Sequence, residues 1–88
     1  MKVAFSSSFN RAFRKRIKNN VEIEDRFWTR MEWFTADPKD PRLRPHKLSG
    51  KLEDLWSFSV TYDVRVIFYF AGEDKAVFID IGTHDEVY

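Results

Sequence analysis

The spacing of apolar residues in this 88-residue chain changes once, and that change limits the folds open to it. Phe9, Phe13 and Ile17 recur every four residues, which is the spacing of one face of an α-helix. From Trp56 onward, apolar and polar residues alternate, which is the pattern of a strand with one buried face. The sequence therefore predicts helices in the first half and a sheet in the second half.

Capping and breaking residues divide the two halves into elements. Serines at 6–8 offer helix caps, Asn19-Asn20 ends the first helix, and Asp37-Pro38 ends the second. The predicted elements are a strand at 2–5, helices up to 18 and over 21–36, a loop at 38–50, and strands at 56–62, 64–70 and 77–81. This order, β-α-α-β-β-β, predicts one α+β domain over 1–88, with two helices on one side of a four-stranded, mostly antiparallel sheet.

The register of the last two strands follows from a four-residue turn at 71–74. With this turn Val66 and Ile79 lie in the core, and a slip by one residue would mix the two faces, whereas slips of two remain open. The pairs expected are Phe68 with Val77, Val66 with Ile79, Val64 with Ile81 and, on the other face, Arg65 with Asp80.

Charge is distributed unevenly along the chain. Residues 1–51 carry thirteen Lys or Arg against six Asp or Glu, whereas residues 52–88 carry two against eight. A basic first half can meet phosphates, and a solvated helix face is the alternative. The chain has no Cys, no apolar run of membrane-spanning length and no signal-peptide pattern, so we expect a cytoplasmic protein without disulfides.

One end of the sheet gathers residues that carry chemistry. His84 follows the last strand and is expected near Asp63 and Arg65, and the tail brings Tyr88 within reach. A base, an acid, a cation and a stacking ring are the groups that RNA cleavage needs. Each also has a structural explanation: Arg65 pairs with Asp80, Asp63 favours a turn, and Tyr88 is a frayed end.

Four segments together resemble a known family. They are His46-Lys47-Leu48-Ser49-Gly50, Leu55-Trp56-Ser57, Asp63-Val64-Arg65-Val66-Ile67-Phe68 and Ile81-Gly82-Thr83-His84 through Tyr88. The chain resembles the RelE/ParE toxin superfamily from Lys2 to Tyr88, and within it the YafQ-like mRNA interferases. The resemblance implies ribosome-dependent cleavage of mRNA in the A site by attack of a 2′-OH, with no metal or cofactor.

The resemblance also assigns roles and partners. His46, Asp63 and His84 match acid/base positions, Arg65 matches the arginine of the third strand, and Tyr88 matches the terminal aromatic residue. Two positions depart from the pattern. Ser59 stands where these toxins tend to carry a histidine, and Asp80 stands where they tend to carry an arginine. A cognate antitoxin is implied as partner, in a toxin–antitoxin hetero-oligomer without membrane contact.

Basic residues of the first half are candidate contacts with ribosomal RNA: Lys15, Arg42, Arg44 and Lys47. Two other functions use the same fold. One is a ParE-like inhibitor of DNA gyrase, and the other is a binding module without catalytic activity. His46 together with His84 favours RNA cleavage, because the ParE-like relatives lack these histidines.

Overall fold

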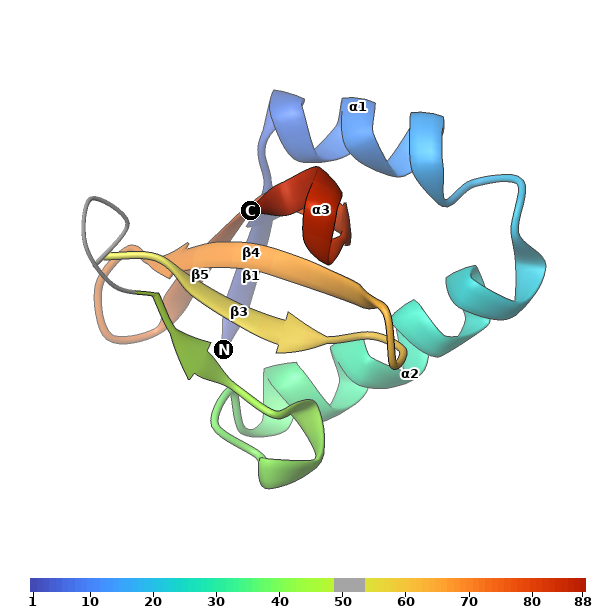
Figure 1. Ribbon diagram of the computed structural model, residues 1–88. Helices are drawn as coiled ribbons and strands as arrows, with labels where there is room; N and C mark the ends of the chain where they lie inside the picture. Colours follow the sequence, from blue (N-terminus) through green and yellow to red (C-terminus); the bar gives the residue numbers. More distant parts are fainter. Residues whose placement is uncertain (49–53) are drawn as a thin grey trace.

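The computed structural model describes residues 1–48 and 54–88, and its strands form one five-stranded sheet in the order β1-β5-β4-β3-β2 (Figure 1). β1 runs parallel to β5, and the other neighbouring strands are antiparallel. The elements are β1 (Lys2–Phe5), α1 (Ser7–Arg16), α2 (Val21–Ala36), the 3₁₀ helix η1 (Pro41–Leu43), β2 (His46–Lys47), β3 (Trp56–Ser59), β4 (Val64–Phe70), β5 (Lys75–Thr83) and α3 (His84–Val87). The predicted α+β class is confirmed.

Side-chain caps start both long helices where the sequence predicts. The amide of Phe9 donates to Oγ of Ser6 at 3.1 Å, and the amide of Ile23 donates to Oδ1 of Asn20 at 3.2 Å. Such caps satisfy amides that have no partner within the helix. The bounds of α2 are those predicted, and Asp37 follows its last residue. No helix in the described part of the chain has the length and apolarity to span a bilayer.

Two segments differ from the predicted loop and tail. The predicted loop at 38–50 contains β2, in which His46 pairs with Ser57 and Lys47 with Trp56. A two-residue strand is too short to show alternation in the sequence. The tail after β5 forms α3 rather than an extended end. Ser49 and Gly50, which belong to the segments that carry the resemblance, lie outside the described residues.

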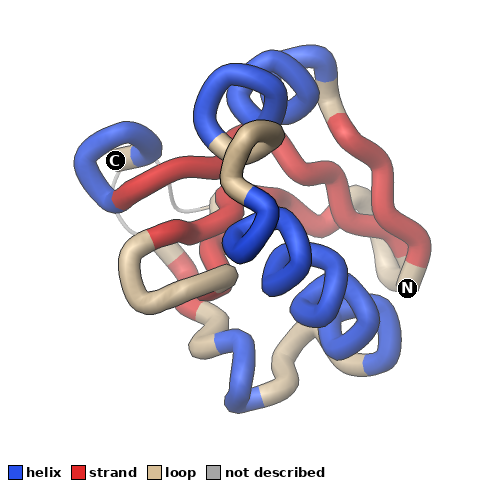
Figure 2. Tube along the Cα trace, turned by 90° about the vertical axis from the view of Figure 1, so that its right-hand side faces the viewer, coloured by secondary structure: helices blue, strands red, loops and turns tan. Residues whose placement is uncertain are grey.

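The core lies between the sheet and the two long helices, which lie along one of its faces (Figure 2). The ring centroid of Phe34 in α2 lies 5.2 Å from Phe58, 5.0 Å from Phe68 and 5.2 Å from Phe78. Phe9 of α1 reaches Phe78 at 5.6 Å, and all five side chains are buried. These rings bury large apolar areas and fix the helices on this face. The other face of the sheet carries α3.

β5 contains a bulge at Ile79. Ile67 pairs with Asp80 and Phe68 pairs with Phe78, so Ile79 has no partner in β4. A bulge adds one residue to one strand and changes which residues face the core beyond it. No residue type announces this bulge in the sequence.

The turn before β5 is also wider than predicted. Phe70 pairs with Ala76 and not with Lys75, and the amide of Ala71 donates to the carbonyl oxygen of Lys75 at 2.8 Å. Gly72 has a φ of 98°, a conformation that glycine adopts without a steric penalty. This width shifts the pairing near the turn by one residue relative to the prediction.

The predicted register is therefore wrong. The observed pairs are Phe68 with Phe78, Val66 with Ile81, Val64 with Thr83 and Arg65 with Gly82. Ala76 and Phe78 are fully buried in the core, whereas Val77 and Ile79 are half-buried. The prediction of Val66 in the core is confirmed, and that of Ile79 is wrong. The wider turn reverses the parity of β5 up to the bulge, and the bulge restores it, so Phe78 and Ile81 face the core and Ile79 does not.

Removing the Phe78 ring tests this register. Phe78→Ala should lower the free energy of unfolding by about 3–5 kcal/mol, because it leaves a cavity among packed aromatic rings. Ile79→Ala should cost clearly less, since Ile79 is half-buried in the bulge. Urea denaturation of both variants measures the difference. Equal losses, or a larger loss for Ile79→Ala, would support the register that the sequence predicted.

Candidate functional site

Arg65 of β4 is held by three hydrogen bonds on the face of the sheet opposite the core. Its Nε donates to Oγ of Ser57 at 3.1 Å, its Nη1 to Oγ of Ser59 at 2.8 Å, and its Nη2 to the carbonyl oxygen of Arg44 at 3.0 Å. All three acceptors are uncharged. Arg65 makes no ion pair with a carboxylate of the described residues, so its positive charge remains available to an anion.

Asp80 does not pair with Arg65, contrary to the sequence prediction. Nη1 of Arg16 in α1 lies 3.0 Å from Oδ1 of Asp80 and also donates to the carbonyl oxygen of Ile81 at 3.0 Å. The wider turn and the bulge each shift the register by one residue, so together they place Gly82 rather than Asp80 opposite Arg65. Sequence reasoning missed Arg16, whose partner comes from the far end of the chain.

Ser57 connects Arg65 to the last residue of the chain. The hydroxyl group of Tyr88 donates to Oγ of Ser57 at 2.7 Å, the same oxygen that accepts from Nε of Arg65. Ser57 is fully buried, so its hydroxyl oxygen is shielded from water and depends on these two donors. The sequence analysis assigned no role to Ser57. Its alternation with the core residue Phe58 was the available signal.

A capping interaction fixes α3 at the end of β5. The amide of Thr83 donates to Oε1 of Glu86 at 2.7 Å. This bond, with a smaller contribution from the charge of Arg16, holds the pKa of Glu86 below its usual value, so the carboxylate is ionised at neutral pH. Gly82 lies close by: an added Cβ would be 2.8 Å from Oε1 of Glu86 and 2.9 Å from Nη1 of Arg16.

α3 presents an imidazole beside an aromatic ring. The ring centroids of His84 and Tyr88 lie 4.5 Å apart at an interplanar angle of 65°. The side chain of His84 is 71% exposed, so it is accessible to a ligand and buries little surface. α3 is only four residues long, and Tyr88 follows its last residue. The hydrogen bond from Tyr88 to Ser57 therefore anchors the end of α3 on the sheet.

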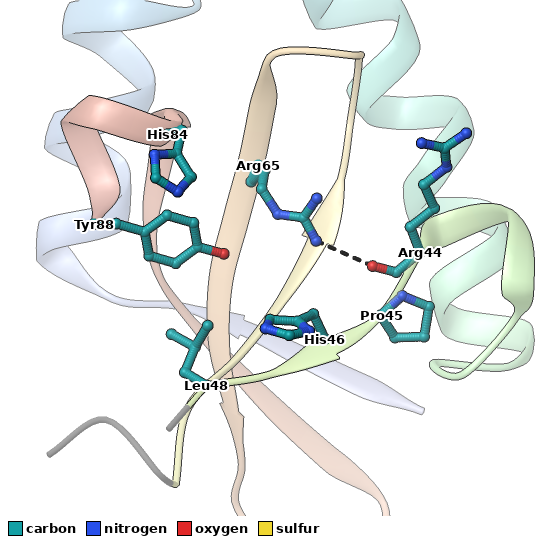
Figure 3. Close-up of a pocket in the computed structure, with 7 residues that line it drawn as sticks. All are labelled: Arg44, Pro45, His46, Leu48, Arg65, His84 and Tyr88. Atoms are coloured by element: carbon teal, nitrogen blue, oxygen red, sulfur yellow. Dashed lines mark hydrogen bonds between the residues drawn. The ribbon is translucent and has the colours of Figure 1, made fainter. Parts of the chain in front are cut away.

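These elements enclose an open groove of about 570 Å³, which we call the histidine groove. Its lining residues are Arg44, Pro45, His46, Leu48, Arg65, His84 and Tyr88. Figure 3 shows His84 and Tyr88 on one side, His46 and Pro45 on the other, and the Arg65 guanidinium between them. The volume lies within the range of small-ligand sites.

The structure brings together four of the five predicted catalytic residues: His46, Arg65, His84 and Tyr88. Asp63 is exposed in the turn before β4 and does not line the groove. The described residues contain no group of three or more His, Cys, Asp or Glu side chains placed to hold a metal ion.

The four predicted RNA contacts separate into different surfaces. Arg44 lines the histidine groove and a neighbouring hollow, which Arg42 also lines. Lys15 lies on α1 beside Asp80, and Lys47 is exposed on β2.

The comparisons with known proteins identify the family. The family model described as the bacterial toxin of type II toxin–antitoxin systems, YafQ, matches residues 1–88. The chain belongs to the YafQ family. A search of curated protein sequences finds no match.

Solved toxins share the fold of this YafQ-family toxin at low sequence identity. The crystal structure of YafQ from E. coli strain BL21(DE3) is 16% identical, with 99% of this chain and 97% of that chain covered and a TM-score of 0.76. The YoeB/ParE toxin from Agrobacterium tumefaciens is 17% identical, with 96% and 99% covered and a TM-score of 0.79. A chain of the YoeB–YefM toxin–antitoxin heterotetramer from Staphylococcus aureus is 12% identical, with 96% and 97% covered and a TM-score of 0.76.

A substitution at Gly82 tests how this YafQ-family toxin positions α3. Gly82→Ala places a methyl group against Glu86 and Arg16, so the capping carboxylate has to move. We expect a loss of about 1–3 kcal/mol in the free energy of unfolding. Nuclear Overhauser contacts between the rings of His84 and Tyr88 should weaken at the same time.

Gly72→Ala is the matched control. Its added Cβ meets no atom within 4 Å, but the positive φ strains the backbone. This variant should lose about 1 kcal/mol and keep the contacts between the two rings. Unchanged ring contacts in Gly82→Ala would show that α3 does not depend on this close approach.

Proposed function

We propose that this toxin is a metal-independent endoribonuclease that cleaves mRNA in the ribosomal A site. The observation that carries the proposal is the histidine groove, where His46 and His84 flank the uncompensated guanidinium group of Arg65. An anionic phosphate seated against Arg65 would have an imidazole on either side. Imidazole exchanges protons near neutral pH, which suits it to both acid and base catalysis.

We propose the following reaction for this groove. One imidazole removes the proton of the ribose 2′-OH, and the 2′-oxygen forms a bond to the adjacent phosphorus. Arg65 stabilises the charge that develops on the phosphate oxygens. The bond to the 5′-oxygen breaks as the second imidazole protonates it, which leaves a 2′,3′-cyclic phosphate and a 5′-hydroxyl group. Either histidine serves as base in this scheme, with the other as acid.

Tyr88 and Asp63 have different places in the proposal. The ring of Tyr88 lines the groove while its hydroxyl group is engaged by Ser57, so the ring is available to stack on an unpaired base. Asp63 lies outside the groove lining, and the mechanism is derived without it. Ser59, at the position where a histidine was expected, orients Arg65.

An antitoxin and a ribosome are the proposed partners. The Staphylococcus aureus relative forms a heterotetramer with its antitoxin, which supports a toxin–antitoxin hetero-oligomer for this chain. The basic residues Lys15, Arg42, Arg44 and Lys47 would contact ribosomal phosphates. Inhibition of DNA gyrase without cleavage is the alternative. Two histidines in one groove favour cleavage over gyrase inhibition and over a silent binding module.

His84→Ala tests the catalytic proposal. The exposed imidazole contributes little to packing, so the melting temperature should stay close to that of the wild type. Loss of one general acid or base should slow cleavage by about 10²–10⁴-fold. An in vitro translation reaction with primer-extension mapping of the mRNA measures this, with Glu73→Ala, an exposed turn variant, as control. Full cleavage by His84→Ala, or loss through unfolding, would contradict the proposal.

Salt dependence tests the ribosome contacts. Each phosphate contact contributes about 0.7–0.9 to the slope of log K against log salt concentration. Replacing Lys15, Arg42, Arg44 and Lys47 together by Gln should therefore flatten the slope by up to about 3. Lys75→Gln, an exposed basic residue of the second half, is the control. Equal slopes for the wild type and the fourfold Gln variant would assign the four residues to a solvated surface.

A further inference from the structure

A second hollow of about 350 Å³ lies next to the histidine groove, and arginines dominate its lining. Those that line it are Arg26, Arg30, Arg42, Arg44 and Arg65. We call this hollow the arginine groove. None of the described residues that line it is acidic. Arg44 and Arg65 line both grooves, so the two hollows are neighbours on the surface.

The charges of the arginine groove are partly uncompensated. Arg26 pairs with Glu22 at 3.3 Å, and Arg42 pairs with Asp40 at 2.7 Å. Arg30 and Arg44 have no ion-pair partner within the described part of the chain.

Arg30 packs against Trp33 beside a second arginine. Its Cζ lies 4.5 Å from the ring centroid of Trp33, and Cζ of Arg42 lies 4.0 Å from the same centroid. Its Nε is shielded from solvent and has no hydrogen-bond partner among the described residues. Burial, and then repulsion from Arg26 and Arg42, lowers the pKa of Arg30. An anion bound here would relieve the repulsion.

Tyr62 points to the kind of anion. It lies in the turn between β3 and β4, lines the arginine groove, and its side chain is fully exposed, so the ring makes no contribution to the core. An exposed ring beside clustered guanidinium groups is the combination that binds single-stranded nucleic acid, with the base on the ring and the phosphate on the cations. An acidic peptide would use the guanidinium groups but not the ring. RNA is therefore the occupant that the residues favour.

We propose that the arginine groove is an RNA subsite that holds the nucleotide next to the cleaved pair. Its phosphate lies on Arg26 and Arg30, and its base stacks on Tyr62. Arg44 and Arg65 connect the subsite to the histidine groove, so a single strand crosses both grooves. The inference rests on the proposed RNA function and adds to it the length of strand that the protein recognises.

Binding of short RNA tests the subsite. The probes are fluorescent 2′-O-methyl RNA dinucleotides, which lack the attacking hydroxyl group, and the same probes extended by two nucleotides on the 5′ or the 3′ side. Extension on one side should tighten binding to the full-length wild type at least tenfold in anisotropy titrations. Arg30→Gln should abolish this increase in affinity. It should also flatten the slope of log K against log salt concentration by about 0.7. Tyr62→Ala should reduce the gain about tenfold, the size of one base stack.

A control variant and three defined outcomes decide whether the arginine groove binds RNA. Arg14→Gln, an exposed arginine of α1, should keep the gain. Tyr62→Ala removes a fully exposed ring, so it answers the question even if Arg30→Gln unfolds. The subsite is overturned if both variants bind extended RNA as the wild type does, or if Arg14→Gln loses the gain equally. It is also overturned if a glutamate-rich peptide binds through Arg30 more tightly than RNA does.

The two proposals fail separately. In one outcome, the wild-type protein binds the extended RNA more tightly than the dinucleotide and yet leaves mRNA intact on ribosomes. That result contradicts the cleavage mechanism and supports the subsite. A protein that cleaves mRNA while Arg30→Gln and Tyr62→Ala bind extended RNA normally overturns the subsite and supports the mechanism.

Discussion

The polar face of the sheet depends on the bulge at Ile79, where β5 carries one residue more than β4. With the wider turn, this extra residue lets both Phe78 and Ile81 face the core, and Asp80 pairs with Arg16 at 3.0 Å. Arg65 then lies opposite Gly82 and has no carboxylate partner among the described residues. The wider turn and the bulge together shift the register at Arg65 by two residues, and this shift takes Asp80 away from the position opposite the guanidinium group.

Hydrogen bonds to uncharged acceptors, and not ion pairs among the described residues, hold Arg65 in the site. Ser57 accepts from Arg65 and Tyr88, and Ser59 accepts from Arg65. Neutral acceptors orient a cation without cancelling its charge, and burial of Ser57 makes both of its bonds costly to break. The arrangement also ties the last residue of the chain to the middle of the sheet, which gives α3 its place.

The same fold sets two kinds of arginine side by side. Arg65 is oriented by uncharged acceptors, whereas Arg26 and Arg42 are paired with Glu22 and Asp40 at the border of the arginine groove. Positive charge without an ion-pair partner among the described residues therefore lies on Arg30, Arg44 and Arg65, along the lining of the two neighbouring grooves. A polyanionic single strand matches such a lining better than an isolated anion does, because its phosphates repeat along the chain.

The sequence by itself determined the local structure: both long helices, the serine cap of the first helix and the strand alternation. It also identified His46, Arg65, His84 and Tyr88, because residue types are visible without coordinates. The tertiary structure decided the register, β2, α3 and the grouping of the arginines. The spacing of apolar residues is a local property of the chain. The register of β4 with β5 depends instead on the width of the turn and on a bulge that no residue type in the sequence marks. Contacts such as Arg16 with Asp80 join residues far apart in the chain, so only folding brings them together.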